Sequence, residues 1–190
     1  MKIIILIVVL LIIGLLFFLA KFGLFAKVII SEREFGPYWL AYVKHYGDYS
    51  KVGPKMDELY YDLKDNFSIE TTKGFGIFYD NPQRVSKDQL RSVVGCIVEG
   101  KAFSDLEKAR EKYGVEEYPA SKSIVAEFPY QGKMSIIIGL LKVYPKLSEY
   151  VQKRQLKEAP IMELYDQPNQ RIEYIVSPYL DEKALNSFLE

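Results

Sequence analysis

The side chain with the clearest capacity for chemistry is the carboxylate of Glu173. It lies in the run 171–176, Arg-Ile-Glu-Tyr-Ile-Val, which predicts a strand near the end of the sequence. On such a strand the carboxylate faces either solvent or a groove, and the sequence leaves both placements open. In a groove walled by aromatic side chains it would suit a cationic or aromatic ligand. The candidates for those walls are Trp39, Tyr46, Phe128 and Tyr130.

Signatures of catalysis and metal binding are missing from the sequence. One histidine and one cysteine form neither an HExxH motif nor a paired CxxC site, and there is no GxSxG elbow or Walker loop. The run 74–76, Gly-Phe-Gly, lacks the third glycine of a dinucleotide fingerprint. His45 at a strand end is interpreted as a surface or structural residue. We therefore predict a binding protein that is not an enzyme, with no catalytic residue, metal site or cofactor.

Two segments, 60–63 and 103–106, match the aromatic-x-x-aliphatic pattern with which autophagy adaptors add a strand to a partner sheet. Both have acidic neighbours. Both also fall in stretches with helical spacing, whereas a working motif of this kind needs an extended and flexible segment. Packing of these side chains in the core is therefore the favoured interpretation.

The charges of the chain are balanced, with 25 lysines and arginines against 25 aspartates and glutamates. This balance argues against bulk electrostatic attraction to nucleic acid and predicts no direct nucleic-acid partner. The single Cys96 closes no disulfide within the chain, which favours a reducing compartment. Fifteen tyrosines and eleven phenylalanines supply aromatic surface for both a core and a pocket.

Residues 3–20 carry no charge and are almost all aliphatic or aromatic. As a helix they span roughly 27 Å, close to the thickness of the hydrocarbon core, with an insertion free energy on the order of −5 to −10 kcal/mol. The alternative is a cleaved signal peptide, but cuts after Ala20 or Ala26 would place Phe18 or Leu24 where a small residue is required. We predict an uncleaved anchor over residues 1–26, with the lipid bilayer as its partner through residues 3–20.

The distribution of lysine and arginine around this run predicts its orientation. Lys2 precedes the run, while Lys21, Lys27 and Arg33 follow it, and the positive-inside bias favours a cytosolic domain after the anchor. The tripeptide 66–68, Asn-Phe-Ser, is a glycosylation acceptor. A glycan on Asn66 in cells would contradict this orientation.

A repeated tetrapeptide indicates an internal duplication. The run 79–82 reads Tyr-Asp-Asn-Pro and the run 165–168 reads Tyr-Asp-Gln-Pro, 86 positions apart. A second echo, at Tyr46 and Tyr130, is offset by 84 positions. Asn-Pro and Gln-Pro are turn chemistry, so each copy ends a strand. We predict one unit used twice, over residues 28–100 and 115–178.

Periodicity predicts the elements of these halves. Each half reads as strand, helix, strand, strand, which is a duplicated β-α-β-β arrangement in an α+β domain over residues 28–178. Helices on one face of such a sheet leave a concave surface on the other, between the halves. A helix over 103–113 ends at Gly114, Pro145 kinks or splits the helix 132–156, and residues 179–190 form a short amphipathic tail. The predicted strands are 28–31, 38–46, 75–79, 90–99, 121–130, 160–165 and 171–176.

The run 76–82, Gly-Ile-Phe-Tyr-Asp-Asn-Pro, followed by Leu-Arg-Ser-Val-Val-Gly-Cys at 90–96, resembles the GyrI-like (SOUL/effector-binding) domains. The closing runs 163–165 and 172–176 resemble the final hairpin of that family. The resemblance implies paired β-α-β-β units around a ligand groove, often with a central glutamate, for which Glu173 is the best match.

With its anchor, the chain is also similar to the testis-expressed endoplasmic-reticulum-phagy receptor family, through the runs 123–130 and 143–147. That resemblance implies an endoplasmic reticulum membrane, a cytosolic domain, and autophagy ubiquitin-like modifiers or an unfoldase as partners. The family binds the modifiers through a long acidic tail. The sequence ends at Glu190 without one, so a modifier-binding motif is expected from a partner or an unusual site.

Three functions follow from these features. The first is a single-pass membrane protein that displays a GyrI-like binding or adaptor domain in the cytosol. The second is a membrane-tethered sensor or scavenger that holds a small aromatic or cationic ligand in the groove between the repeats, with Glu173 as a contact. The third and weakest is a hydrolase of small electrophiles.

Overall fold

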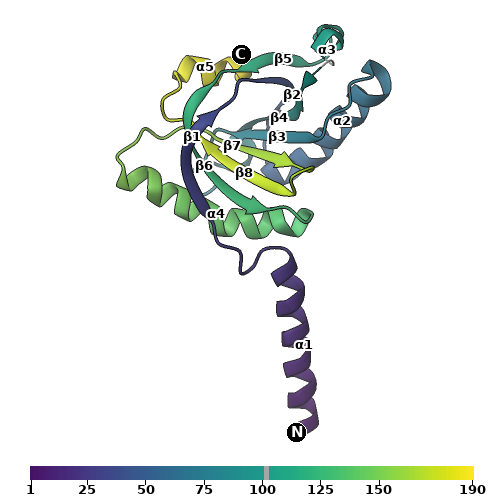
Figure 1. Cartoon of the computed structure of the whole chain (residues 1–190), viewed down its shortest axis with the longest axis vertical. Coiled ribbons are helices and arrows are strands. Elements are labelled where there is room, and N and C mark those ends of the chain that lie inside the picture. The colour runs from purple at the N-terminus through teal and green to yellow at the C-terminus, as the bar shows by residue number, and fades with distance from the viewer. Residues whose placement is uncertain (101–102) are drawn as a thin grey trace.

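An eight-stranded antiparallel sheet forms the body of the protein, and helix α1 extends from it (Figure 1). The computed structural model describes residues 1–100 and 103–190. The strand order is β1-β6-β8-β7-β3-β4-β2-β5. The strands are β1 (Ile29–Phe35), β2 (Tyr38–Tyr46), β3 (Lys73–Phe78), β4 (Arg91–Val98), β5 (Gly114–Tyr118), β6 (Ser121–Pro129), β7 (Ile161–Asp166) and β8 (Arg171–Val176). The α-helices are α1 (Lys2–Lys21), α2 (Val52–Phe67), α3 (Phe103–Ala109), α4 (Lys133–Lys153) and α5 (Glu182–Asn186).

The duplicated α+β architecture is confirmed. The units β2-α2-β3-β4 and β6-α4-β7-β8 have the same order of elements and the same pairing, with β3 beside β7 at the centre of the sheet. Each repeat also begins with an extra strand, and these strands are exchanged. Strand β1 pairs with β6 of the second repeat, and β5 pairs with β2 of the first.

Strand β5 is absent from the sequence prediction, which assigned residues 103–113 to a helix ended by Gly114. In the structure α3 ends at Ala109 and Gly114 begins β5. A side chain at Gly114 would overlap the ring of Tyr42. The glycine is therefore explained by a close approach between strands, which periodicity along the chain does not reveal.

Helices α2 and α4 cover one face of the sheet. Against α2 pack Ala41 and Cys96, and against α4 pack Ala126 and Tyr174. Helix α4 continues through Pro145 as a single helix, so the predicted split at that residue does not occur. We call the opposite face of the sheet the inner face. Its core residues include Phe35, Leu40, Tyr42, Phe75, Ile77, Val125, Met162, Leu164 and Ile175.

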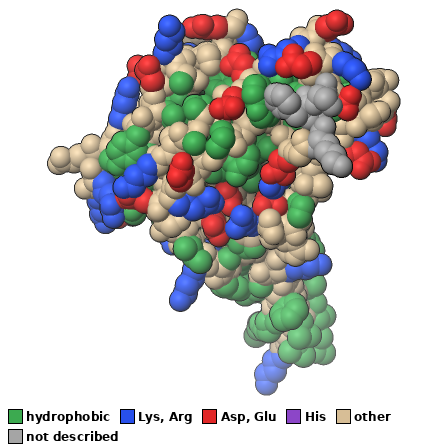
Figure 2. Space-filling view, turned by 45° about the horizontal axis from the view of Figure 1, so that its top comes forward, with side chains coloured by type: hydrophobic (Ala, Val, Ile, Leu, Met, Phe, Trp, Pro, Cys, Tyr) green, Lys and Arg blue, Asp and Glu red, His purple; other side chains and the backbone are tan. Residues whose placement is uncertain are grey.

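Helix α1 has no buried residue, its mean hydropathy is 3.6, and its exposed side chains are largely hydrophobic (green in Figure 2). It is long and apolar enough to cross a membrane, and in the described part of the chain it is the one helix that meets this test. Beyond it, Phe22 and Ala26 lie against the cluster under α4. The helix therefore leaves the domain through a packed junction.

Gly95 brings β4 and β2 together at a point where no side chain fits. A Cβ atom there would overlap the carbonyl oxygen of Ala41 and lie 2.8 Å from the Cα atom of Tyr42. Because both obstacles are backbone, we expect Gly95→Ala to lower the free energy of unfolding by about 1–3 kcal/mol. Urea denaturation of the full chain in detergent measures this loss. Gly53→Ala is the control, since a Cβ on Gly53 meets nothing within 4 Å; equal losses in both variants would contradict the explanation.

Candidate ligand groove

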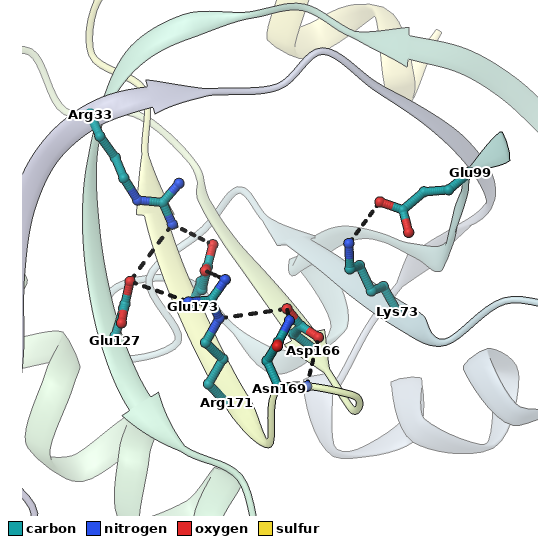
Figure 3. Close-up of polar contacts among 8 residues, drawn as sticks. All are labelled: Arg33, Lys73, Glu99, Glu127, Asp166, Asn169, Arg171 and Glu173. Atoms are coloured by element: carbon teal, nitrogen blue, oxygen red, sulfur yellow. Dashed lines mark hydrogen bonds and ion pairs between the residues drawn. The ribbon is translucent and has the colours of Figure 1, made fainter.

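Glu173 lies on the inner face of the sheet, where its carboxylate is held by arginines on both sides (Figure 3). Arg33 Nη2 on β1 donates to Glu173 Oε2 at 2.7 Å. Arg171 Nη2, two residues earlier on β8, is 2.8 Å from Glu173 Oε1, an ion pair without hydrogen-bond geometry. The Glu173 side chain is only 4% exposed. Each oxygen of this buried carboxylate therefore has a guanidinium group beside it.

Two further acidic residues complete this ion cluster of five residues. Glu127 Oε1 on β6 lies 3.9 Å from Arg33 and 3.8 Å from Arg171, and it is about one-third exposed. Asp166 Oδ2 at the end of β7 lies 3.5 Å from Arg171 Nε. Four strands thus contribute charges to one place on the inner face.

The pairing changes what Glu173 can do. A free carboxylate in a groove would attract a cationic ligand, but this one already has two cations from its own chain. Removing either arginine leaves the charge of the buried Glu173 carboxylate only partly compensated, which costs free energy. A cationic ligand would reach Glu173 only after an arginine had left it.

The four aromatic residues expected around Glu173 do not surround it, so the predicted aromatic wall is wrong. Trp39 is on the α2 face, with the Arg110 guanidinium 5.9 Å from its ring centroid. Phe128 and Tyr130 pack in the cluster under α4, and Tyr46 is 59% exposed. Alternation along a strand separates the two faces, but which set faces inward is set by helix packing. The aromatic residues near the inner face are instead Phe35, Tyr38, Tyr42, Phe75, Tyr79, Tyr118 and Phe188.

The C-terminal segment, residues 179–190, covers part of the inner face. The Phe188 ring is fully buried against the rings of Tyr42 and Tyr118. The Tyr79 hydroxyl donates to the carbonyl of Leu185 at 2.6 Å. The predicted amphipathic tail is therefore part of the core. A cavity of about 290 Å³ remains at its edge, bordered by Tyr79, Arg91, Lys157, Leu180 and Leu185 among others.

With this geometry in view, comparison with known proteins identifies the family. Residues 30–177 match the GyrI-like small molecule binding domain. The chain belongs to the GyrI-like family. The resemblance seen in the runs 76–82 and 90–96 is confirmed.

Two curated relatives are similar to this chain. Human testis-expressed protein 264 is 31% identical over 167 residues, which cover 83% of this chain and 51% of that protein. The testis-expressed protein 264 homologue of the mouse (Mus musculus) is 30% identical to this chain over 135 residues, which cover 67% of this chain and 41% of the mouse protein. The chain spans about half the length of the curated relatives that it matches.

Solved structures show the same fold at low sequence identity. The crystal structure of the EcmrR C-terminal domain has a TM-score of 0.51 and 12% identity, covering 79% of this chain and 98% of that one. The cryo-EM structure of an EcmrR–DNA complex has a TM-score of 0.52 and 14% identity, covering 78% of this chain and 56% of that one. These likenesses concern the fold alone.

The GyrI-like domain contains a second buried carboxylate, Glu163, which the sequence analysis missed. It lies on β7 under α4, and the hydroxyls of Tyr144 and Tyr165 donate to its two oxygens at 2.6 and 2.5 Å. Burial raises its pKa above the ordinary value. Its position between Met162 and Leu164 in an apolar strand is the same signal that drew attention to Glu173.

Glu163 makes stability depend on pH in a defined direction. Because its pKa is raised on folding, the folded state holds a proton that the unfolded state releases from about pH 4.5 upward. Stability is therefore greatest below that pH and falls as pH rises through the folded pKa. The variant Glu163→Gln has no titrating group at this position. We therefore expect the difference in unfolding free energy, unmodified chain minus variant, to decrease as pH rises. Urea titrations from about pH 4 to about pH 8 test this; a flat or rising difference would contradict it.

The repeated tetrapeptides of the GyrI-like domain end equivalent strands and bind an arginine of the next strand. Asp80 accepts from the Arg91 backbone N–H and, at 2.8 Å, from Nη2 of its guanidinium. The corresponding Asp166 lies 3.5 Å from Arg171 and accepts from Asn169. The hydrogen bonds from Arg91 lower the pKa of Asp80. In the second repeat the same turn chemistry places Arg171 beside Glu173.

The remaining candidates from the sequence lie in structural positions. His45 Nε2 lies 3.1 Å from the carbonyl oxygen of Asp48. Burial raises the pKa of the Cys96 thiol to about 11. In the first autophagy-like pattern, Leu63 is fully buried in helix α2. In the second, the side chain of Phe103 lies outside the described residues, and Leu106 is buried.

Proposed function

We propose that this chain is a single-pass protein of the endoplasmic reticulum membrane that presents its GyrI-like domain to the cytosol as an adaptor in reticulophagy. Support comes from the similarity to testis-expressed protein 264 and from the apolar helix α1. The excess of lysine and arginine after α1 supports the cytosolic orientation. An adaptor needs a binding surface and no turnover chemistry, and the proposal includes no enzymatic activity.

The internal pairing of Glu173 is the observation that carries the choice of adaptor over small-molecule sensor. In this chain the carboxylate is neutralised by Arg33 and Arg171. The other part of the inner face is filled by Leu185 and Phe188. With both regions occupied from within, the outer surface of the domain is the better candidate for recognition.

Orientation is tested by glycosylation in cells. Asn66 is exposed at the end of α2 and is sterically available. We expect the full chain to carry no glycan there, and an acceptor sequence with a spacer placed ahead of Met1 to be glycosylated. A glycan on Asn66, with none on the added acceptor, would place the domain in the lumen and overturn the proposal.

Partner choice is tested with the purified full chain in detergent. We expect autophagy ubiquitin-like modifiers or a complex containing them to be captured equally by the unmodified chain and by Glu173→Gln. We expect tetraphenylphosphonium, a lipophilic cation, to show no saturable binding. Saturable binding that is lost in Glu173→Gln would favour the sensor, and Glu173-dependent hydrolysis of a small electrophile would favour the enzyme.

The sensor remains the second candidate because of the cavity beside the C-terminal segment. Its volume of about 290 Å³ is near the lower limit for small-molecule sites. Tyr79 supplies an aromatic wall, while the charges of Arg91 and Lys157 are balanced by Glu158 and Glu182 in the same lining. A neutral aromatic compound therefore suits this cavity better than the cation expected from the sequence.

A further inference from the structure

Helix α4 carries an exposed apolar surface on the side that faces away from the sheet. Leu141 is 74% exposed, Ile137 is 53% exposed, and Leu140 is 37% exposed. The next turns of the same helix expose Lys146, Ser148 and Glu149 instead. The apolar surface is therefore confined to the first half of α4, and with Phe25, which is 69% exposed, we call it the α4 patch.

The α4 patch lies beside the junction with α1. Lys142 Nζ donates to the backbone carbonyls of Leu24 at 2.5 Å and Ala26 at 2.7 Å, and more weakly to Gly23 at 3.3 Å. Figure 1 shows α4 between the sheet and α1. These hydrogen bonds hold the exposed half of α4 close to the point where α1 ends.

Packing makes this junction stiff. Gly23 has a positive φ of 96°, and a Cβ atom there would lie 2.6 Å from the Phe128 ring. The neighbouring Phe22 and Ala26 contact the cluster under α4. The position of α4 relative to the end of α1 is therefore set by side-chain contacts on both sides of the junction.

The geometry points to the membrane as the occupant of the α4 patch: we propose that the exposed half of α4 lies in the interfacial layer of the bilayer that α1 crosses. This rests on the proposed membrane anchoring. If residues 3–20 fill the hydrocarbon core, Lys21 marks its boundary, and the headgroup layer beyond is about 5–8 Å thick. The carbonyls that bind Lys142 follow within five residues of Lys21, which is headgroup depth.

The charges around the patch fit an anionic lipid surface. The stretch 21–31 contains Lys21 and Lys27 and no acidic residue, and the stretch 133–148 contains Lys133 and Lys146, besides the internally bonded Lys142, and no acidic residue. Amphipathic helices that lie in a membrane surface combine an apolar face with flanking lysines in this way. The protein would then contact the bilayer in two places, through the anchor α1 and through α4.

Depth-dependent quenching tests the proposal on the full chain. In a Cys96→Ala background, single cysteines at Leu141, at Tyr61 and at Leu10 are labelled with an environment-sensitive dye. The proteins are placed in vesicles of phosphatidylcholine and phosphatidylserine that contain lipids spin-labelled near the headgroup, and in a second set of vesicles whose lipids are spin-labelled near the end of the acyl chain, the depth expected for Leu10. Tyr61 on α2 is a matched control, since it is 60% exposed. We expect the dye at Leu141 to be quenched several-fold more strongly than the dye at Tyr61.

The dye at Leu10 separates failure of this inference from failure of the proposed anchoring. Quenching at Leu10 with Leu141 behaving like Tyr61 would overturn the α4 contact while the anchor stands. No quenching at Leu10 by the acyl-chain label would overturn both. A Leu141 dye that is shielded from aqueous iodide yet unaffected by the lipid quencher would overturn the membrane contact and assign the patch to a second copy of this chain. Ile137→Cys, on the same face, should repeat the Leu141 result if the label itself does not create the contact.

Discussion

Phe188→Ala is expected to lower the free energy of unfolding by about 3–5 kcal/mol, the range for a buried phenylalanine. The ring is fully buried and contacts the rings of Tyr42 and Tyr118. Its removal leaves a cavity on the inner face that only a shift of the C-terminal segment can fill. Urea denaturation of the full chain in detergent measures the loss.

Tyr179→Ala is the control in the same segment, because Tyr179 is 55% exposed. It should change the unfolding free energy by no more than about 0.5 kcal/mol. A small loss in Phe188→Ala, similar to that in Tyr179→Ala, would mean that the segment does not belong to the core. The inner face would then be open to ligands, and the sensor would become the better functional proposal.

Removing both arginine partners of Glu173 is expected to cost about 3–5 kcal/mol, because it leaves a buried carboxylate without a counter-charge. The change is Arg33→Met together with Arg171→Met, which keeps much of the apolar stem of each side chain. The loss should be visible in urea denaturation near pH 7.

A third substitution shows whether the cost arises from Glu173 itself. Adding Glu173→Met to the double variant removes the unpaired charge, and we expect most of the lost stability to return. Adding Glu127→Gln in its place is the control, since Glu127 is about one-third exposed and its contacts with the arginines are longer. Equal recovery in the two triple variants would show that general charge, and not the buried carboxylate, sets the cost.

These two predictions address one question, namely what occupies the inner face of a GyrI-like domain in this chain. Arginines occupy the carboxylate, and the C-terminal segment occupies the aromatic part. Both are intramolecular contacts, and both are lost in variants that are simple to make. If either variant gains binding of a small molecule as it loses stability, the groove is functional but closed in the unmodified chain.

The sequence alone was sufficient for features that depend on neighbouring residues. The apolar run 3–20 predicts α1, the two Tyr-Asp-x-Pro runs predict equivalent turns, and apolar periodicity predicts α2 and α4. The same local patterns carried the family resemblance, which residues 30–177 confirm. Each of these signals lies within a short stretch of sequence, so it can be recognised without knowledge of the fold.

Only the tertiary structure decided the features that join distant residues. Arg33 and Glu173 are 140 positions apart, and the exchange of β1 and β5 between the repeats depends on pairing across the whole sheet. Alternation showed that Trp39 and Phe128 lie on one face of their strands, but helix packing decided which face. Glu173 was identified from its residue type and its strand. Its partners were not, because a strand pattern contains no information about which strand lies beside it.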